Sequence, residues 1–164
     1  MKHLSQARYP APPDVVMRMF SDVNFHTRKL EQMGFSSFRV LGHSFDGKDF
    51  RIKVERKVPM QVPGLLKKVV PSESTAINEE SWNVQAGTGR VVVEPVGMPL
   101  EISCVARIEA HGQECLISYD WTIKARIPLV GGALEKFVAS DMDKHFARET
   151  AIAVSLLRDY QKIS

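Results

Sequence analysis

The sequence LEISCVARIEAHGQECLISYDWTIKARI, residues 100–127, is the most informative part of the chain. Apolar side chains take every second position on both sides of His111-Gly112, which is the pattern of two antiparallel strands with one buried face. A short break, Pro128 to Gly132, follows, and from Ala133 to Ile163 the apolar period becomes that of a helix. A sheet that passes directly into a long amphipathic helix gives the helix a face to lie against. If the sheet is curved, a pocket is left between the two.

The register of this last hairpin is predicted by matching apolar residues across the strands. With His111-Gly112 as the loop, the expected partners are Ile108 with Cys115, Ala106 with Ile117, Cys104 with Tyr119, Ile102 with Trp121, and Leu100 with Ile123. The other face is polar and is expected to be wet. This register keeps the two cysteines too far apart for a disulfide.

The rest of the chain is divided by prolines and glycines into further elements. The Asp46-Gly47 pair is a strong hairpin signal, with Phe45 set opposite Lys48 and His43 opposite Phe50. The expected elements are a strand at Lys2–Tyr9, helices at Asp14–Phe20 and Asp22–Met33, and strands at Ser36–Phe45, Asp49–Val58, Thr75–Val84, Gly89–Val96, Leu100–Glu109 and Glu114–Arg126.

Composition and charge exclude several classes of function. A chain of 164 residues with 44% hydrophobic and 25% charged residues fits one globular domain, residues 1–164. The 22 basic and 19 acidic side chains are scattered, so nucleic acid is not expected as a partner. No apolar run is long enough for a signal peptide or a membrane span, which favours a cytoplasmic protein. No Cys/His cluster has metal spacing, so neither a metal nor a cofactor is expected.

Three segments of this order resemble a known superfamily. They are YPAPPDVV at residues 9–16, Glu80-Ser81-Trp82 in a middle strand, and IPLVGGALE at residues 127–135, which joins the last strand to the last helix. Together they resemble the START and polyketide-cyclase superfamily (SRPBCC), in particular a bacterial branch of unknown function. The resemblance implies an α+β helix-grip fold, in which about seven antiparallel strands, in the order β-α-α-β-β-β-β-β-β-α, grip the C-terminal helix around an apolar cavity.

Members of the superfamily bind lipids, sterols, polyketides, hormones or quinones, and a minority are cyclases, aromatases or hydrolases. Because one fold hosts many functions, the resemblance implies a class of ligand and no particular activity. Polar groups on inward faces are the useful candidates, since a pocket needs a few oriented anchors among apolar walls. The cavity candidates are His43, Ile52, Arg56, Leu65, Leu66, Glu80, Trp82, Ile102, Cys104, Tyr119, Trp121, Val138, Met142 and His145, with Asn78 beside Glu80.

Arg56 and Glu80 form the sharpest pair among these candidates. An inward charge is costly unless it is paired or meets a charged ligand. Arg56 is suited to a carboxylate ligand, and a salt bridge at the rim of the sheet explains it as simply.

The last helix offers a second polar set, because Asp141, His145 and Glu149 follow one another at four-residue spacing on one face. They fit an acid–base relay, part of a metal site, or ordinary solvated helix charges. Ser140 with Asp143 has the form of a capping box, which would restart the helix and expose Asp141.

The segment from Pro59 to Pro71 is a proline-bounded apolar excursion between two strands. Val62, Leu65 and Leu66 fit a helical turn that covers the core, and the same turn is a candidate lid. Beside Lys67-Lys68 it is also suited to transient contact with an anionic membrane surface.

No nucleophile motif or phosphate loop is present, so the sequence favours binding over catalysis. The leading hypothesis is binding or transfer of a hydrophobic small molecule (lipid, quinone, sterol-like or polyketide-like) between the sheet and the last helix. The alternative is a polyketide cyclase or dehydratase-like enzyme that uses His43, Arg56, Glu80 or His145. A third possibility is a module that docks a protein through Leu65 and Leu66.

Overall fold

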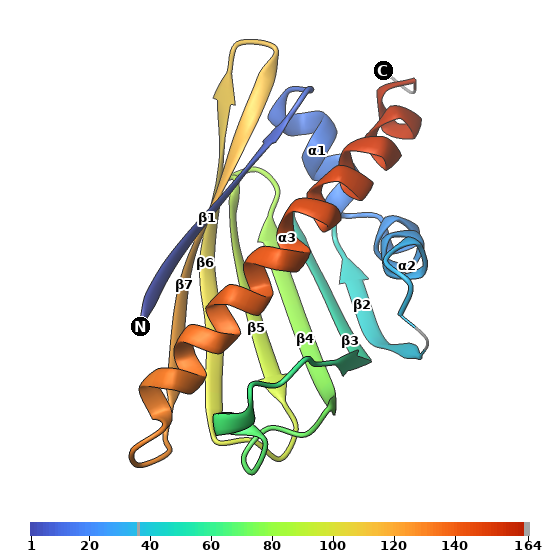
Figure 1. The fold of residues 1–164 in the computed structure, drawn as a ribbon. Helices are drawn as coiled ribbons and strands as arrows, with labels where there is room; N and C mark the ends of the chain where they lie inside the picture. The colour runs from blue at the N-terminus through green and yellow to red at the C-terminus, as the bar shows by residue number, and fades with distance from the viewer. Residues whose placement is uncertain (36, 163–164) are drawn as a thin grey trace.

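A curved antiparallel sheet wraps one side of a long helix in the computed structural model, which describes residues 1–35 and 37–162 (Figure 1). The seven strands have the order β1-β7-β6-β5-β4-β3-β2, and every neighbouring pair is antiparallel. This confirms the α+β helix-grip architecture. The elements are β1 (Lys2–Tyr9), α1 (Pro13–Phe20), α2 (Val23–Gln32), β2 (Phe38–Phe45), β3 (Asp49–Pro59), the 3₁₀ helix η1 (Gly64–Leu66), β4 (Glu73–Asn83), β5 (Thr88–Pro95), β6 (Leu100–His111), β7 (Glu114–Ala125) and α3 (Gly131–Gln161).

The helices and strands begin and end close to the expected residues, because prolines, glycines and capping residues mark these ends in the sequence. Asp22 caps α2, and its side chain accepts a hydrogen bond from the backbone N–H of Asn24 at 3.0 Å. Helix α3 runs through Ser140 without a break, so the expected restart at a capping box is wrong. Ser36 and Ile163, the expected ends of a strand and of the last helix, lie outside the described residues.

The last hairpin has the expected faces but a different register. His111 pairs with Glu114, so the loop is Gly112-Gln113 and each residue faces a partner two positions further along. Gly112 has a φ of +64°, which the first loop position of a tight hairpin requires. A shift of two keeps every side chain on its face, so matching apolar residues cannot distinguish the two registers.

The β2–β3 hairpin is shifted for a different reason. Asp46 accepts hydrogen bonds from the backbone N–H groups of Lys48 and Asp49, at 2.9 and 2.7 Å, and this closes a longer loop in which Phe45 pairs with Phe50. A bulge between Val40 and Gly42 then turns Leu41 outward, where it is 41% exposed.

The core consists of three groups of buried residues on the concave face of the sheet, and two of these groups meet α3. At the end where α1 lies, Tyr9, Trp82 and Ile117 pack with Leu157 of α3. At the opposite end, Leu66 and Ile123 pack with Leu134 and Val138. Both cysteines are buried in these groups and are free. None of the helices within residues 1–35 and 37–162 has the length and apolar character needed to span a membrane.

Two ion pairs connect α2 to α3. Lys29 Nζ lies 2.8 Å from Glu149 Oε1, and Arg28 Nη1 lies 2.9 Å from Asp159 Oδ2. Burial lowers the pKa of Lys29, but attraction to Glu149 and Glu80 outweighs it and the net pKa is raised. Burial raises the pKa of Glu149, while Lys29 and, more weakly, Arg56 lower it, and the net pKa is below its ordinary value.

We predict that Gly89→Ala destabilises the fold. A Cβ at this position would lie 2.5 Å from the Trp82 ring, which is fully buried and has no room to move. The expected loss in the free energy of unfolding is about 1–3 kcal/mol, as for other overpacked cores. Gly42→Ala is the control, since nothing lies within 4 Å of its Cβ. Equal urea midpoints for the two variants would contradict this account.

We predict that Glu149→Gln costs roughly 1 kcal/mol of stability at neutral pH, because it leaves Lys29, whose side chain is only 14% exposed, without its counter-charge. The value is modest because the Glu149 side chain is 36% exposed and water screens the pair. The pKa of Glu149 is lowered on folding, so its contribution is complete above the unfolded-state pKa, about 4.3, and is lost as the pH falls through the lower folded value.

Urea unfolding of both proteins between pH 7 and pH 3 measures this effect. The gap between wild type and Glu149→Gln should stay constant down to about pH 5 and close below about pH 4. Asp159→Asn is the matched control, because it breaks a pair whose side chains are 45% and 51% exposed and should cost much less. A gap that widens in acid would contradict the assigned sign.

Candidate functional site

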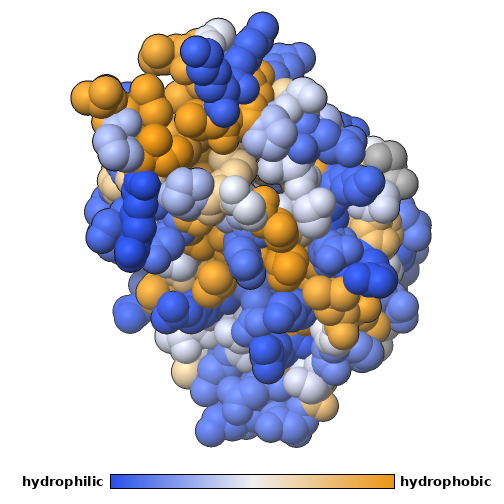
Figure 2. All heavy atoms as spheres, turned by 90° about the horizontal axis from the view of Figure 1, so that it is seen from below, coloured by the Kyte–Doolittle hydropathy of each residue, from blue (hydrophilic) through white to orange (hydrophobic). Residues whose placement is uncertain are grey.

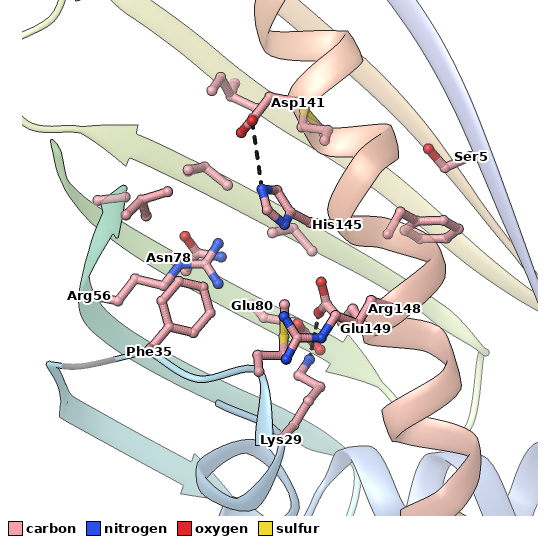
Figure 3. A pocket seen from close by; sticks show the side chains of 18 of the residues that line it. Ser5, Lys29, Phe35, Arg56, Asn78, Glu80, Asp141, His145, Arg148 and Glu149 are labelled. Atoms are coloured by element: carbon pink, nitrogen blue, oxygen red, sulfur yellow. Dashed lines mark hydrogen bonds and ion pairs between the residues drawn. The ribbon is translucent and has the colours of Figure 1, made fainter. Parts of the chain in front are cut away.

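A cavity of about 370 Å³ lies between the concave face of the sheet and the middle of α3 (Figure 3). Its walls take residues from both core groups that meet α3, so it occupies the space between them. The wall includes Tyr9, Lys29, Phe35, Arg56, Asn78, Glu80, Ile102, Tyr119, Trp121, Val138, Asp141, Met142, His145, Arg148 and Glu149.

Strand register explains which sheet residues reach this cavity. Partners across antiparallel strands point to the same face, so the inward positions form rows across the sheet. One row contains Ile52, Glu80, Val91, Cys104 and Trp121, on β3 to β7 in turn. Glu80, Val91 and Trp121 of this row line the cavity, whereas Ile52 and Cys104 are covered by packed side chains.

Arg56 is the least satisfied charge in the cavity. Its Nε is buried, and within residues 1–35 and 37–162 that atom has no hydrogen-bond partner. The guanidinium lies over the Phe35 ring, 4.9 Å from the ring centroid. Burial lowers the pKa of Arg56, and attraction to Glu149 opposes this only in part.

Two neutral groups in the cavity are also unsatisfied. The side-chain oxygen of Asn78 and the indole N–H of Trp121 are buried, and neither has a partner among the described residues. Tyr119 stacks on Trp121, with ring centroids 6.5 Å apart. Burial, with the nearby Tyr9 hydroxyl and the carboxylates of Glu80 and Glu149, raises the pKa of Tyr119 well above its ordinary value.

Of the two explanations that the sequence left open for Arg56, the salt bridge with Glu80 is not formed among the described residues. Arg56 pairs with Ala76, whereas Glu80 lies opposite Ile52, four residues away and roughly 13 Å along the strand. Glu80 instead accepts a hydrogen bond from the indole N–H of Trp82 at 3.0 Å. Arg56 is therefore left without the strand-end salt bridge that the sequence suggested.

The polar set on α3 is divided between two partners. Asp141 and His145 are 3.6 Å apart, and His145 is 52% exposed at the edge of the cavity. Glu149 turns to Lys29, so the three side chains do not form a chain of hydrogen bonds. Among the described residues no group of His, Cys, Asp and Glu is placed to hold a metal ion.

Most of the expected cavity residues line it. They are Arg56, Asn78, Glu80, Ile102, Tyr119, Trp121, Val138, Met142 and His145.

The other expected residues lie outside the cavity, for identifiable reasons. His43 lies on the edge strand β2 and is exposed, while Leu65 projects from η1 and is 71% exposed. Four have inward side chains that are covered by packed neighbours, namely Ile52, Leu66, Trp82 and Cys104.

Lys29 and Phe35 line the cavity but are not among the residues predicted from the sequence. Lys29 lies between Phe25 and Met33 at four-residue spacing, so it interrupts the apolar face of α2. This interruption was the sequence feature from which an inward-facing lysine could have been predicted. Phe35 follows Gly34, whose φ of +82° ends the helix and directs the chain toward β2. Its position over Arg56 depends on tertiary packing alone.

Solved structures of low sequence identity share this fold. TTHA0849 from Thermus thermophilus is 18% identical, with a TM-score of 0.66 over 97% of this chain and 98% of that one. The Zhui aromatase/cyclase from Streptomyces sp. R1128 is 8% identical, with a TM-score of 0.63 over 96% and 93%. A START superfamily protein from Mycobacterium smegmatis is 12% identical, with a TM-score of 0.56 over 99% of both chains.

These likenesses confirm the resemblance to the START and polyketide-cyclase superfamily at the level of the fold. A comparison with curated protein sequences finds no match. The family model described as "Protein of unknown function (DUF2505)" matches residues 5–157. The match covers most of the chain, which therefore belongs to the DUF2505 family.

Proposed function

We propose that this chain binds, and carries or transfers, a hydrophobic small molecule between the sheet and α3. The observation that carries the proposal is the cavity of about 370 Å³, which falls within the usual range of ligand sites, about 300–1,000 Å³. Its apolar wall includes Ile102, Val138 and Met142, and the aromatic rings of Tyr119 and Trp121 add flat contact surface. Such a wall suits a compact ring-bearing ligand or a short apolar chain.

We predict that the native protein binds one apolar ligand per chain. Native mass spectrometry after gentle purification, followed by a panel of lipids and quinones, measures this. Met142→Trp should fill the cavity and weaken binding by about tenfold or more. Val92→Trp is the control, because Val92 lies on the outer face of β5 and is 37% exposed. A panel without any binder would overturn the proposal.

One observation favours a second candidate, a cyclase or dehydratase-like enzyme. Arg56, Glu80 and His145 reach the same cavity from three different elements, as proton transfer to a bound substrate would require. One structural neighbour is an aromatase/cyclase by name. Turnover of a short poly-β-ketone, followed by NMR and reduced at least about a hundredfold in Glu80→Gln without loss of binding, would support it.

A transient contact with an anionic membrane belongs to the same proposal. Figure 2 views the end of the molecule that carries residues 59–71 and the loop before α3, and apolar side chains gather on part of it. Leu65 and Leu129 are exposed there, 71% and fully, and Lys67 and Lys68 are also exposed. Leu66 is buried, so it cannot contribute to docking as expected from the sequence.

We predict that the double variant Leu65→Ser, Leu129→Ser reduces sedimentation with vesicles of phosphatidylserine and phosphatidylcholine. The reason is that transfer of an exposed leucine side chain from water into the acyl boundary of the membrane is favourable. Ligand binding in solution should be unchanged, since neither side chain lines the cavity. Equal sedimentation of wild type and variant would rule out this contact, and loss of a protein partner instead would favour the docking module.

A further inference from the structure

Arg56 differs from the other cations that line the cavity. Lys29 meets the carboxylate of Glu149 at 2.8 Å, and Arg148 donates to the carbonyl of Gln32 at 3.3 Å. Within residues 1–35 and 37–162, no carboxylate lies within ion-pair distance of Arg56. A partly buried guanidinium without a counter-ion is costly, and an anion delivered by a ligand removes that cost.

Contact with Phe35 orients the side chain of Arg56 before any ligand arrives. The guanidinium lies over the Phe35 ring, and the strand partner Ala76 is too small to fill the space beside it. A fixed guanidinium presents a rigid fork of N–H donors, which matches the two oxygens of a carboxylate. Preorganisation of this kind improves affinity, because little side-chain entropy remains to be lost on binding.

Asn78 supplies a second group at the same place. It lies two residues beyond Ala76 on β4, so it is a diagonal neighbour of Arg56 across the two strands. Figure 3 shows both side chains reaching into the space between the sheet and α3. The unpartnered atom of Asn78 is its side-chain oxygen, which accepts, and a half-turn of the amide exchanges it with the NH₂ group, which donates a hydrogen bond to a carboxylate.

The rest of the cavity wall indicates the chemistry of the ligand's body. Ile102 and Trp121 lie on β6 and β7, across the sheet from Arg56, and Val138 and Met142 of α3 lie on the same cavity wall. Arg56 and Asn78 on β3 and β4 are thus separated, by the width of β5, from the apolar surface of Ile102 and Trp121 on β6 and β7. This division suits a molecule with one acidic end and an apolar body.

We infer that the ligand is an apolar carboxylic acid, with its carboxylate bound by Arg56 and Asn78 and its body lying toward Ile102 and Trp121. The inference rests on the proposed function and adds the chemical class of the ligand. It requires no covalent step.

The test uses N-phenyl-1-naphthylamine, an uncharged fluorescent probe of apolar cavities, with decanoate and 1-decanol as competitors. The two competitors share a chain length and differ in the head group, and at about pH 8 the acid is ionised. Wild-type protein should bind decanoate about tenfold or more tightly than 1-decanol, as expected for a charge-assisted hydrogen bond. Equal affinities would overturn the inference.

Three variants locate the effect. Arg56→Met should abolish the preference by weakening decanoate and leaving 1-decanol within about threefold, and Arg56→Lys should restore part of it. Arg90→Met is the control and should keep the full preference, because Arg90 is exposed on the outer face of β5. A preference that survives in Arg56→Met would overturn the assignment.

The test distinguishes failure of the proposed function from failure of the inference that the ligand is a carboxylic acid. If the probe does not bind to wild-type protein and neither competitor does, the proposed function fails and the inference fails with it. If the probe binds and both competitors displace it equally, the cavity is a binding site without an acid-specific end. The wild-type comparison decides this even if Arg56→Met does not fold.

Discussion

The packing of α3 across the concave face of the sheet determines which parts of the interior are a packed core and which part is a cavity. The buried residues of α3 fall into two groups, Gly131 to Ala139 at one end and Ala153 to Tyr160 at the other. The 14 steps of rise from Ala139 to Ala153 span roughly 21 Å of helix axis. Helix α3 therefore packs against the sheet near both of its ends, and the cavity separates the middle of the helix from the sheet.

Much of this arrangement could be predicted from the sequence, because strand faces follow from a period of two and helix faces from a period of 3.6. The inward positions of Ile102, Tyr119 and Trp121 depend on the face alone and are correct. The exact partners depend on turn geometry, and both predicted hairpins are shifted because Asp46 and Gly112 shape their loops. In the last hairpin a shift of two residues leaves the faces unchanged, whereas the bulge in β2 also turns Leu41 outward.

The cavity wall was harder to predict, because an inward side chain is not the same as a wall side chain. Ile52 and Cys104 point inward but are covered by packed neighbours, and Trp82 is covered by Phe20 of α1. Conversely, Lys29 reaches the cavity only because α2 is fastened beside α3. These positions depend on how helices and sheet are placed in space, which a periodic pattern does not encode.

The distribution of partners among the charged groups favours binding over proton transfer. A general base needs a pKa near the working pH and a lone pair directed at the substrate. Glu149 is paired with Lys29, and its pKa is lowered rather than raised. Glu80 accepts the indole N–H of Trp82, so that oxygen has a structural partner. The unsatisfied atoms of the cavity belong instead to Arg56, Asn78 and Trp121, whose side chains can form hydrogen bonds and exchange no proton near neutral pH. Two of these atoms, Nε of Arg56 and the indole nitrogen of Trp121, are donors, which fits the proposed binding of an acidic molecule.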